Sequence, residues 1–383
     1  FTLVLYLKIK GFVKLSTIST LIIIILIYKR RIDMKFKIKQ EKLMEHLNYV
    51  IKGVSTKNLI PILNCIKFEL TEEGLYLMST DNEIAIKTFI NKNEIVEIEQ
   101  TGSIVISGRY IYDIIRKLPN TVVNIEEVMD SKVYIFTDNS SFNLNCNSVN
   151  EFPDLNLDIS KNPITFDKKI FKNIVSQTTF ASSTQESRPV LTGINFKIEG
   201  DTLECVATDS YRLSKKIVKL DCIVENNINI IIPTKNLNEL IKLFNDDEEK
   251  IEMHIFNNKV IFKFNDIIMM TTLISGSYPD TSKLIPNEFA LEVTINLYEM
   301  YNALDRASLL TNQDDKNTIN LETLDEKIKI SSNIPEIGNV EENISALKNN
   351  NENIKIAFSS RYMMDALKAF NGDKVTLCFN GEI

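Results

Sequence analysis

The sequence has few of the residues on which most enzyme mechanisms depend. It contains only two histidines and 11 glycines among 383 residues. Histidine is the side chain that most often moves protons near neutral pH, and we expect His46 and His254 to pack within apolar-periodic segments instead. No glycine-rich phosphate loop, HxE or DxD motif occurs. The usual nucleotide-binding and metal-dependent hydrolase sites are therefore not indicated.

Cysteine is also scarce and is not arranged for cross-linking or metal binding. The five cysteines are far apart, odd in number and never form CxxC. This spacing argues against a disulfide framework and against a zinc site. We expect a cytoplasmic protein without a metal or other cofactor, in which all five are buried thiols: Cys65, Cys146, Cys205, Cys222 and Cys378.

A hydrophobic run long enough to span a bilayer is missing. The run Leu21–Tyr28 precedes three basic residues, but a spanning helix needs about 20 apolar residues. The order of a signal peptide, with a charged start and a small-residue cleavage site, is absent too. Met34 opens a strand that leads into a helix. We therefore interpret residues 1–33 as an upstream or artefactual extension, with a membrane anchor as the alternative.

An excess of positive charge is also lacking. From Met34 onward the chain holds 38 basic and 50 acidic residues, a net charge of −12. A protein with this negative net charge is not attracted to nucleic acid by its overall charge, so any contact with nucleic acid needs a local basic surface.

What the sequence does contain is an internal repeat. Thr80-Asp81 and Thr208-Asp209 lie 128 residues apart, and "IPILNCIKFEL" at 60–70 aligns with "RPVLTGINFKI" at 188–198. Further on, "IVISGRYIYDIIRKL", "IIIPTKNLNELIKLF" and "IAFSSRYMMDALKAF" align at spacings of 126. These alignments give two triplets of equivalent residues: Arg109, Lys235 and Arg361, and Asp113, Glu239 and Asp365. A unit of this length is large enough to form its own hydrophobic core, so the repeat predicts three homologous domains.

The predicted domains are 34–160, 161–286 and 287–383, and by analogy with the second we expect the third to be truncated by about 25 residues at its C-terminal end. Each begins with an alternating strand and an amphipathic helix. The predicted buried helix faces are Leu43, Leu47 and Val50; Phe171, Val175 and Thr178; and Met300, Leu304 and Ala307. Alternating segments such as "CIKFEL" and "GLYLMST" indicate antiparallel sheets with one buried face. The fold class is α+β, with two strand-helix-strands groups per domain and both helices on one side.

Many polar positions of the predicted helices are basic. Acidic residues are interspersed among them, so an ordinary solvated helix face remains the alternative to a nucleic-acid surface. The basic positions are Lys42, Lys52, Arg109, Arg116, Lys117, Lys168, Lys169, Lys172, Lys235, Lys242, Arg306, Arg361 and Lys368.

From Met34 to Ile383 the sequence resembles the bacterial DNA polymerase III beta subunit, the replication sliding clamp. The resemblance rests on "MKFKI", "PIL", "FPDL", "RPVLTGINF", "VATDSYRL", the segment from "YPD" to "LIP", and the triple repeat. It implies three DNA-clamp domains per chain and a head-to-tail homodimer that closes into a ring around double-stranded DNA. The helices would form the inner wall and the sheets would lie outside.

The resemblance also implies two sets of site residues. The first contacts DNA, with Pro189 and Val190 standing where the family has an aromatic pair: Lys57, Arg109, Gln185, Pro189 and Val190. The second forms a groove that captures short peptides of the replicative polymerase, the clamp loader and other clamp-binding proteins: Leu191, Thr208, Ser210, Tyr211, Arg212, Leu213, Pro279, Lys283, Leu284 and Ile383.

Two alternatives to a sliding clamp remain open from the sequence. One is a metal-dependent nucleic-acid or sugar hydrolase centred on Asp209, and the other is a monomeric peptide-binding scaffold. Because the Thr-Asp pair recurs in the repeat, we expect Asp81 and Asp209 to cap turns after strands and not to act as catalytic acids. We expect no enzyme activity.

Overall fold

The computed structural model describes residues 34–381 except 56–58, 129–131, 246–249 and 312–316. The apolar run Leu21–Tyr28 lies outside the described residues. The described residues form two compact units. One contains the residues up to Asp158 together with Lys263–Met270, and the other contains Ile159–Phe262 and the residues from Thr271 onward. Among the helices described, none combines the length and the apolar character needed to cross a bilayer.

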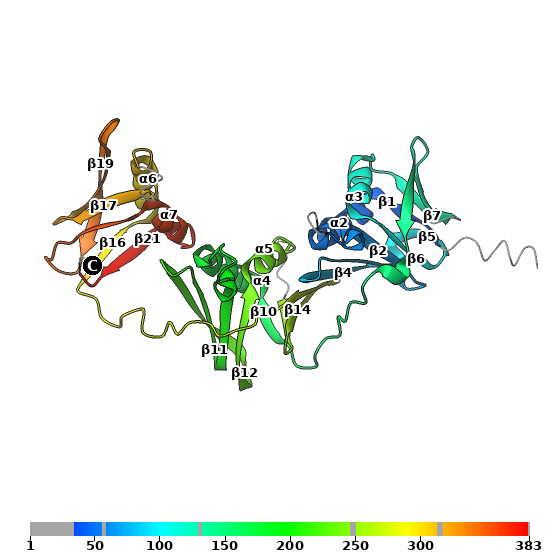
Figure 1. Ribbon diagram of the computed structural model, residues 1–383, viewed down its shortest axis with the longest axis horizontal. Helices are drawn as coiled ribbons and strands as arrows, with labels where there is room; N and C mark the ends of the chain where they lie inside the picture. Colours follow the sequence, from blue (N-terminus) through cyan, green and yellow to red (C-terminus); the bar gives the residue numbers. More distant parts are fainter. Residues whose placement is uncertain (1–33, 56–58, 129–131, 246–249, 312–316, 382–383) are drawn as a thin grey trace, which may run out of the picture. The chain divides into compact units, whose positions relative to one another are not determined.

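The first copy of the repeat consists of two successive strand-helix-strands groups, coloured blue to green in Figure 1. Helices α2 and α3 pack against each other, and neighbouring strands pair antiparallel in the order β4-β3-β2-β6-β9-β8-β7-β1-β5. The elements are β1 (Lys35–Lys39), α2 (Gln40–Val50), β2 (Cys65–Leu70), β3 (Gly74–Thr80), β4 (Ile84–Asn91), β5 (Ile95–Gln100), β6 (Gly102–Ser107), α3 (Gly108–Lys117), β7 (Val122–Val128), β8 (Lys132–Phe136) and β9 (Ser141–Asn147).

The second copy repeats this plan around a long antiparallel hairpin of β11 and β12. Helices α4 and α5 again contact each other. The turn after β14 belongs to the first compact unit, where the Phe89 N–H of β4 donates to the Asp266 carbonyl at 3.1 Å. The elements are β10 (Ile164–Asp167), α4 (Lys168–Thr178), β11 (Gly193–Thr208), β12 (Leu213–Pro233), α5 (Thr234–Ile241), β13 (Lys250–Ile255), β14 (Lys259–Phe264) and β15 (Ile267–Thr272).

The third copy has its own hydrophobic core, in which α6 and α7 pack on a sheet of order β20-β17-β18-β19-β16-β21. Buried Met300, Leu304 and Ala307 of α6 meet strand residues such as Leu321 and Ile330. The elements are β16 (Leu291–Asn296), α6 (Leu297–Ser308), β17 (Thr318–Thr323), β18 (Lys327–Ile334), β19 (Gly338–Lys348), β20 (Lys355–Ser359), α7 (Ser360–Lys368) and β21 (Lys374–Phe379).

Equivalent positions of the repeat occupy equivalent places in the fold. Pro61 and Pro189 each start a short 3₁₀ helix, where a residue without an N–H and with a fixed φ is tolerated. The predicted helix faces and the aligned strand positions are all buried, which confirms the α+β repeat. These residues are Leu43, Leu47, Val50, Ile66, Phe68, Phe171, Val175, Thr178, Ile194, Phe196, Met300, Leu304 and Ala307.

The strand β3 does not have the predicted wet face, and this expectation was wrong. Six of its seven residues are buried, because both faces are covered. On one face α2 packs, and Ser79 donates its hydroxyl to the Val50 carbonyl. On the other face Met78 packs with Phe152 from the segment after β9.

Two expectations about exposure were also wrong. Cys65 and Cys205 are buried and Cys146 is half-buried, but Cys222 and Cys378 are exposed. In β21 the residues on either side of Cys378 face the core, so strand alternation turns its thiol outward. Lys168 is only 3% exposed, because a side chain in the first helical turn leans back over the preceding strand.

Both histidines are packed, as expected. His46 is 4% exposed, and its Nδ1 lies 2.7 Å from Thr88 Oγ1. His254 is 1% exposed and lies between Ser160 Oγ at 3.0 Å and Glu252 Oε2 at 3.2 Å.

Candidate functional site

The two Thr-Asp pairs form the same turn in the first two copies. Asp81 Oδ1 accepts the N–H groups of Glu83 and Ile84 at 3.0 and 2.8 Å. Asp209 Oδ1 accepts those of Tyr211 and Arg212 at 2.9 and 3.0 Å. The capping prediction is confirmed. These bonds orient the carboxylates toward the turn, so they act as caps and not as free catalytic acids.

The threonines and the residues after the aspartates complete the match. Thr80 Oγ1 donates to the Ile84 carbonyl at 2.8 Å, and Thr208 Oγ1 donates to the Arg212 carbonyl at 2.6 Å. Asn82 and Ser210 both adopt left-handed backbone, with φ of 77° and 78°. This conformation is uncommon outside glycine, and the side-chain bonds around it hold each turn in place.

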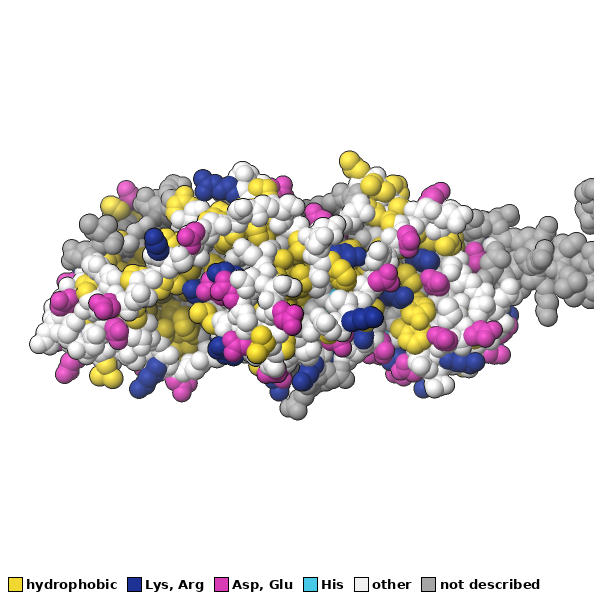
Figure 2. Space-filling view, turned by 90° about the horizontal axis from the view of Figure 1, so that it is seen from below, with side chains coloured by type: hydrophobic (Ala, Val, Ile, Leu, Met, Phe, Trp, Pro, Cys, Tyr) yellow, Lys and Arg dark blue, Asp and Glu magenta, His cyan; other side chains and the backbone are white. Residues whose placement is uncertain are grey.

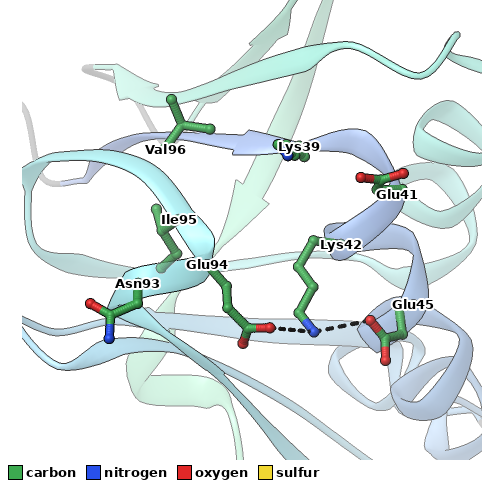
Figure 3. A pocket seen from close by; sticks show the side chains of 8 residues that line it. All are labelled: Lys39, Glu41, Lys42, Glu45, Asn93, Glu94, Ile95 and Val96. Atoms are coloured by element: carbon green, nitrogen blue, oxygen red, sulfur yellow. Dashed lines mark hydrogen bonds and ion pairs between the residues drawn. The ribbon is translucent and has the colours of Figure 1, made fainter.

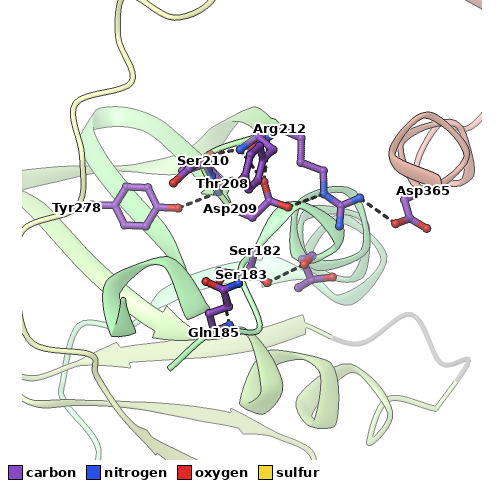
Figure 4. Close-up of polar contacts among 11 residues, drawn as sticks. Ser182, Ser183, Gln185, Thr208, Asp209, Ser210, Arg212, Tyr278 and Asp365 are labelled. Carbon is purple, nitrogen blue, oxygen red and sulfur yellow. Dashed lines mark hydrogen bonds and ion pairs between the residues drawn. The ribbon is translucent and has the colours of Figure 1, made fainter. Parts of the chain in front are cut away.

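The second turn carries a further polar network centred on Arg212 (Figure 4). Arg212 occupies the position of buried Ile84. Its Nε donates to Asp209 Oδ2 at 3.0 Å, and its Nη1 donates to Asp365 Oδ2 of α7 at 2.8 Å. The guanidinium carbon also lies 4.3 Å from the centre of the Tyr362 ring. Arg212 is therefore engaged by two carboxylates and a ring face.

Tyr278 supports the same turn from the segment that follows β15. Its hydroxyl accepts the N–H of Thr208 at 3.0 Å (Figure 4). Burial raises the pKa of this phenol to about 12, against a smaller opposite effect of the hydrogen bond. The hydroxyl stays protonated at neutral pH. It is a structural partner of the turn.

The structure brings together part of the predicted groove. The turn residues Thr208, Ser210, Tyr211, Arg212 and Leu213 are contiguous, and Pro279 follows the supporting Tyr278. Tyr211 is 74% exposed and Leu284 is 63% exposed, as suits a surface that receives a partner. Leu191 is only 4% exposed, so little of its side chain is accessible at the surface. Lys283 is exposed, and Ile383 lies outside the described residues.

The loop with the predicted DNA contacts adjoins this turn. Gln185 and Pro189 are exposed and Val190 is half-buried. Between them, Arg188 Nη1 donates to Ser210 Oγ at 3.2 Å. The Gln185 N–H donates to Ser183 Oγ at 3.0 Å, which orders the loop (Figure 4). Lys57, the equivalent of Gln185 in the first copy, lies outside the described residues.

The basic helix positions divide into paired and unpaired residues. Several form ion pairs, for example Arg116 with Asp113 at 2.8 Å and Arg306 with Glu342 at 2.7 Å. In contrast, six exposed cations form no ion pair with any described residue: Arg109, Lys117, Lys172, Lys235, Arg361 and Lys368, the last of which lies over the Tyr301 ring instead. Three of these, Arg109, Lys235 and Arg361, are the equivalent residues of the repeat. Each is the second residue of its helix, α3, α5 or α7.

The other surfaces give weaker indications of a functional site. On the face shown in Figure 2, acidic and basic side chains are interspersed. An open hollow of about 620 Å³ near the start of α2 contains Lys42, whose Nζ contacts Glu45 at 3.0 Å and Glu94 at 2.7 Å (Figure 3). Lys42 is therefore already paired with two carboxylates of this hollow. Across the described ranges, no group of three or more His, Cys, Asp or Glu side chains is placed to hold a metal ion.

Sequence reasoning missed two residues of the site. Tyr278 belongs to the "YPD" motif, but its contact with Thr208 joins segments 70 residues apart. Asp365 was recognised only as an equivalent of Asp113. The repeat identified the position of Asp365, but its pairing with Arg212 spans 153 residues and follows from tertiary packing alone.

Comparisons with known proteins agree with the repeat. Residues 34–158, 165–280 and 282–383 match the N-terminal, central and C-terminal domains of the DNA polymerase III beta subunit. The beta sliding clamp of Bacillus subtilis is 40% identical over 353 residues, which cover 91% of this chain and 93% of the relative. That of Staphylococcus aureus is 40% identical over 352 residues, with the same coverage.

Solved structures give the same result. The crystal structure of the Bacillus subtilis sliding clamp aligns with a TM-score of 0.87 at 39% identity, covering 91% of this chain and 93% of that one. The beta chain from Streptococcus pneumoniae aligns with a TM-score of 0.87 at 32% identity, covering 91% and 94%. Neither the family nor the capped Asp209 supports the hydrolase alternative. The chain belongs to the DNA polymerase III beta subunit family, the bacterial beta sliding clamps.

Proposed function

We propose that this chain is a sliding clamp that encircles duplex DNA without reading its sequence and tethers the replicative polymerase in the cytoplasm. It is a non-catalytic processivity factor. Beyond family membership, the observation that carries the proposal is the repeated placement of Arg109, Lys235 and Arg361. In all three copies an exposed cation without an ion-pair partner among the described residues stands at the same helix start.

This placement is unfavourable for the isolated protein. The N-terminus of a helix carries a partial positive charge, so a cation there opposes the helix dipole. In α2 and α6 the first turn follows the usual preference, with Glu41 and Glu299, whereas α4 also begins with cations, Lys168 and Lys169. A cation and a helix start together attract anions. Three equivalent sites of this kind suit a regular lattice of phosphates.

Contacts of this type also suit sliding. Lys and Arg side chains attract phosphates without reading bases, and one phosphate can replace the next as the protein moves. Bidentate contacts to base edges would instead hold the protein at one sequence. The overall acidic charge disfavours binding of DNA to other surfaces. Gln185 and Lys57 are proposed to add DNA contacts from their loops, with Pro189 and Val190 beside Gln185.

The ring is proposed to close as a head-to-tail homodimer. In the first compact unit β4 is hydrogen-bonded to β15. Strand β4 is the third strand after α2, and β15 is the third strand after α5. The strand at the position of β4 in the third copy is β19, the third strand after α6. The strand at the position of β15 in the first copy is β9, the third strand after α3. Among the described strands, β9 pairs with β8 and at its end with β6, so one edge of Ser141–Asn145 is open. Such edges favour pairing with another chain.

The peptide groove is proposed to consist of the turn 208–213 with Leu191, Pro279, Lys283, Leu284 and Ile383. Exposed Tyr211 and Leu284 provide apolar surface for a Leu or Phe anchor of a partner. Thr208 is bonded within its own turn, so it contributes mainly by holding the turn in shape. Polymerase, clamp loader and other proteins with a clamp-binding segment are the proposed partners.

Topology provides the decisive test of the ring. The protein is loaded with a clamp loader onto nicked circular DNA and then separated from free protein by gel filtration. We expect it to remain on the circle and to leave after the circle is cut once, because a ring slides off an end. Equal retention on both DNA forms would show ordinary surface binding. A monomer in sedimentation equilibrium, without retention, would favour the scaffold alternative.

A further inference from the structure

The three equivalent acidic residues of the repeat do not share one partner. Asp113 of α3 accepts from Arg116, three residues on, at 2.8 Å. Glu239 of α5 accepts from Lys242, also three residues on, at 2.7 Å. Exposed pairs of this kind on a single helix contribute little to stability. They show what this position does when no other partner is present.

In the third copy the same position makes a different contact. The residue three positions after Asp365 is Lys368, whose Nζ lies over the Tyr301 ring at 5.5 Å from its centre. Asp365 instead accepts from Arg212 Nη1 at 2.8 Å, across 153 residues of chain. The Arg212 side chain is 19% exposed, against 54% for Arg116 and 59% for Lys242, so the cation of this pair is better shielded than those of its counterparts.

Neighbouring contacts fix the geometry of the pair. The Arg212 guanidinium lies 4.3 Å from the centre of the Tyr362 ring of α7, and 5.7 Å from that of Phe180. Gln177 Nε2 donates to the Ala369 carbonyl at the end of α7 at 2.9 Å. Two independent polar bonds therefore connect α7 to the part of the second copy that carries the turn 208–213.

We propose that Asp365 is a positioning residue for the peptide groove. Together with Asp209 it holds the Arg212 guanidinium, and through Arg212 it anchors the turn 208–213 of the second copy to α7 of the third. A groove built from a turn and a separate segment requires both to keep a fixed shape before the peptide arrives. The inference rests on the proposed peptide groove.

The test measures peptide affinity in the full chain. A short fluorescein-labelled peptide with Leu and Phe anchors is titrated with wild type, Asp365→Asn and Asp365→Glu, and anisotropy is followed. We expect Asp365→Asn to bind about 3- to 10-fold more weakly, and Asp365→Glu to recover most of the loss. The matched controls Asp113→Asn and Glu239→Gln change the same repeat position without touching Arg212, and they are expected to bind as wild type does.

A second measurement separates this proposal from the groove itself. Hydrogen exchange of the Tyr211 and Arg212 amides, which donate to Asp209, is expected to be faster in Asp365→Asn than in the two controls. Wild-type affinity of Asp365→Asn would overturn the proposal. If wild type binds no peptide, the proposed groove fails, and exchange alone decides whether Asp365 anchors the turn: faster exchange supports it, and unchanged exchange overturns it.

Discussion

Asp81 and Asp209 lie 128 residues apart and make the same pair of hydrogen bonds, each accepting the N–H groups two and three positions further along. The two turns differ at the third residue after the aspartate. After Asp81 this residue is buried Ile84, while after Asp209 it is Arg212, which extends to α7. Both turns are capped in the same way, but the second one also makes a charged contact with α7 through Arg212.

Replacing the two aspartates should separate these roles. We expect Asp81→Ala and Asp209→Ala each to lower the free energy of unfolding by about 1–2 kcal/mol, because two backbone N–H groups lose a charged acceptor. Only Asp209→Ala should also weaken peptide binding, since it releases Arg212. Urea denaturation and peptide anisotropy measure the two effects. Equal peptide affinities of the two variants would contradict the assignment.

The repeated cations give a prediction about salt dependence. Changing Arg109, Lys235 or Arg361 to alanine should reduce the slope of log affinity against log salt concentration by about one per residue lost. The Arg116→Ala variant provides a control on α3, because Arg116 is already paired with Asp113. Affinity for a short duplex is measured over a salt series. A larger change in slope for Arg116→Ala than for Arg109→Ala would contradict the proposed DNA surface.

His46 predicts a loss of stability in acid. Its pKa is lowered from 6.5 to about 4, mainly by burial and secondarily by Lys42, against smaller opposite effects of Glu45 and Glu94. Because the folded state favours the neutral ring, its contribution is fully present above pH 6.5 and is lost as the pH falls toward 4. The full difference amounts to about 3 kcal/mol.

The His46→Gln variant should unfold with a weaker dependence on pH in this window, because glutamine does not titrate. The chain has only two histidines. Proton NMR can therefore assign each ring by single substitution, with His254→Gln as the partner variant. Titration of the His46 ring near pH 6.5 in the folded protein would contradict this prediction.

The sequence was sufficient for the repeat, the buried helix faces and the turn role of the aspartates. Each follows from local spacing: Leu43 and Leu47 lie one helical turn apart, and the Thr-Asp pair recurs at a fixed offset. The sequence did not predict the burial of β3 on both faces, because Phe152 covers it from 74 residues beyond Met78. Nor did it predict the partner of Asp365, which is brought near by packing between copies of the repeat.

Thiol reactivity can check the exposure of the cysteines directly. Cys222 is exposed and should react first with a thiol reagent in the folded protein. Cys378 is also exposed, but partial desolvation of its outward-facing thiol and nearby Glu292 raise its pKa, so less thiolate is present and it should react more slowly.

The remaining three thiols should react only on unfolding. Burial raises the pKa of Cys146 to about 12 and raises those of Cys65 and Cys205 as well. Mass spectrometry after brief labelling identifies the modified residues, and Cys222→Ser should remove the fastest phase alone. Because the core thiols become accessible only when their strands separate, rapid labelling of Cys205 in the native protein would show that β11 is not packed as described.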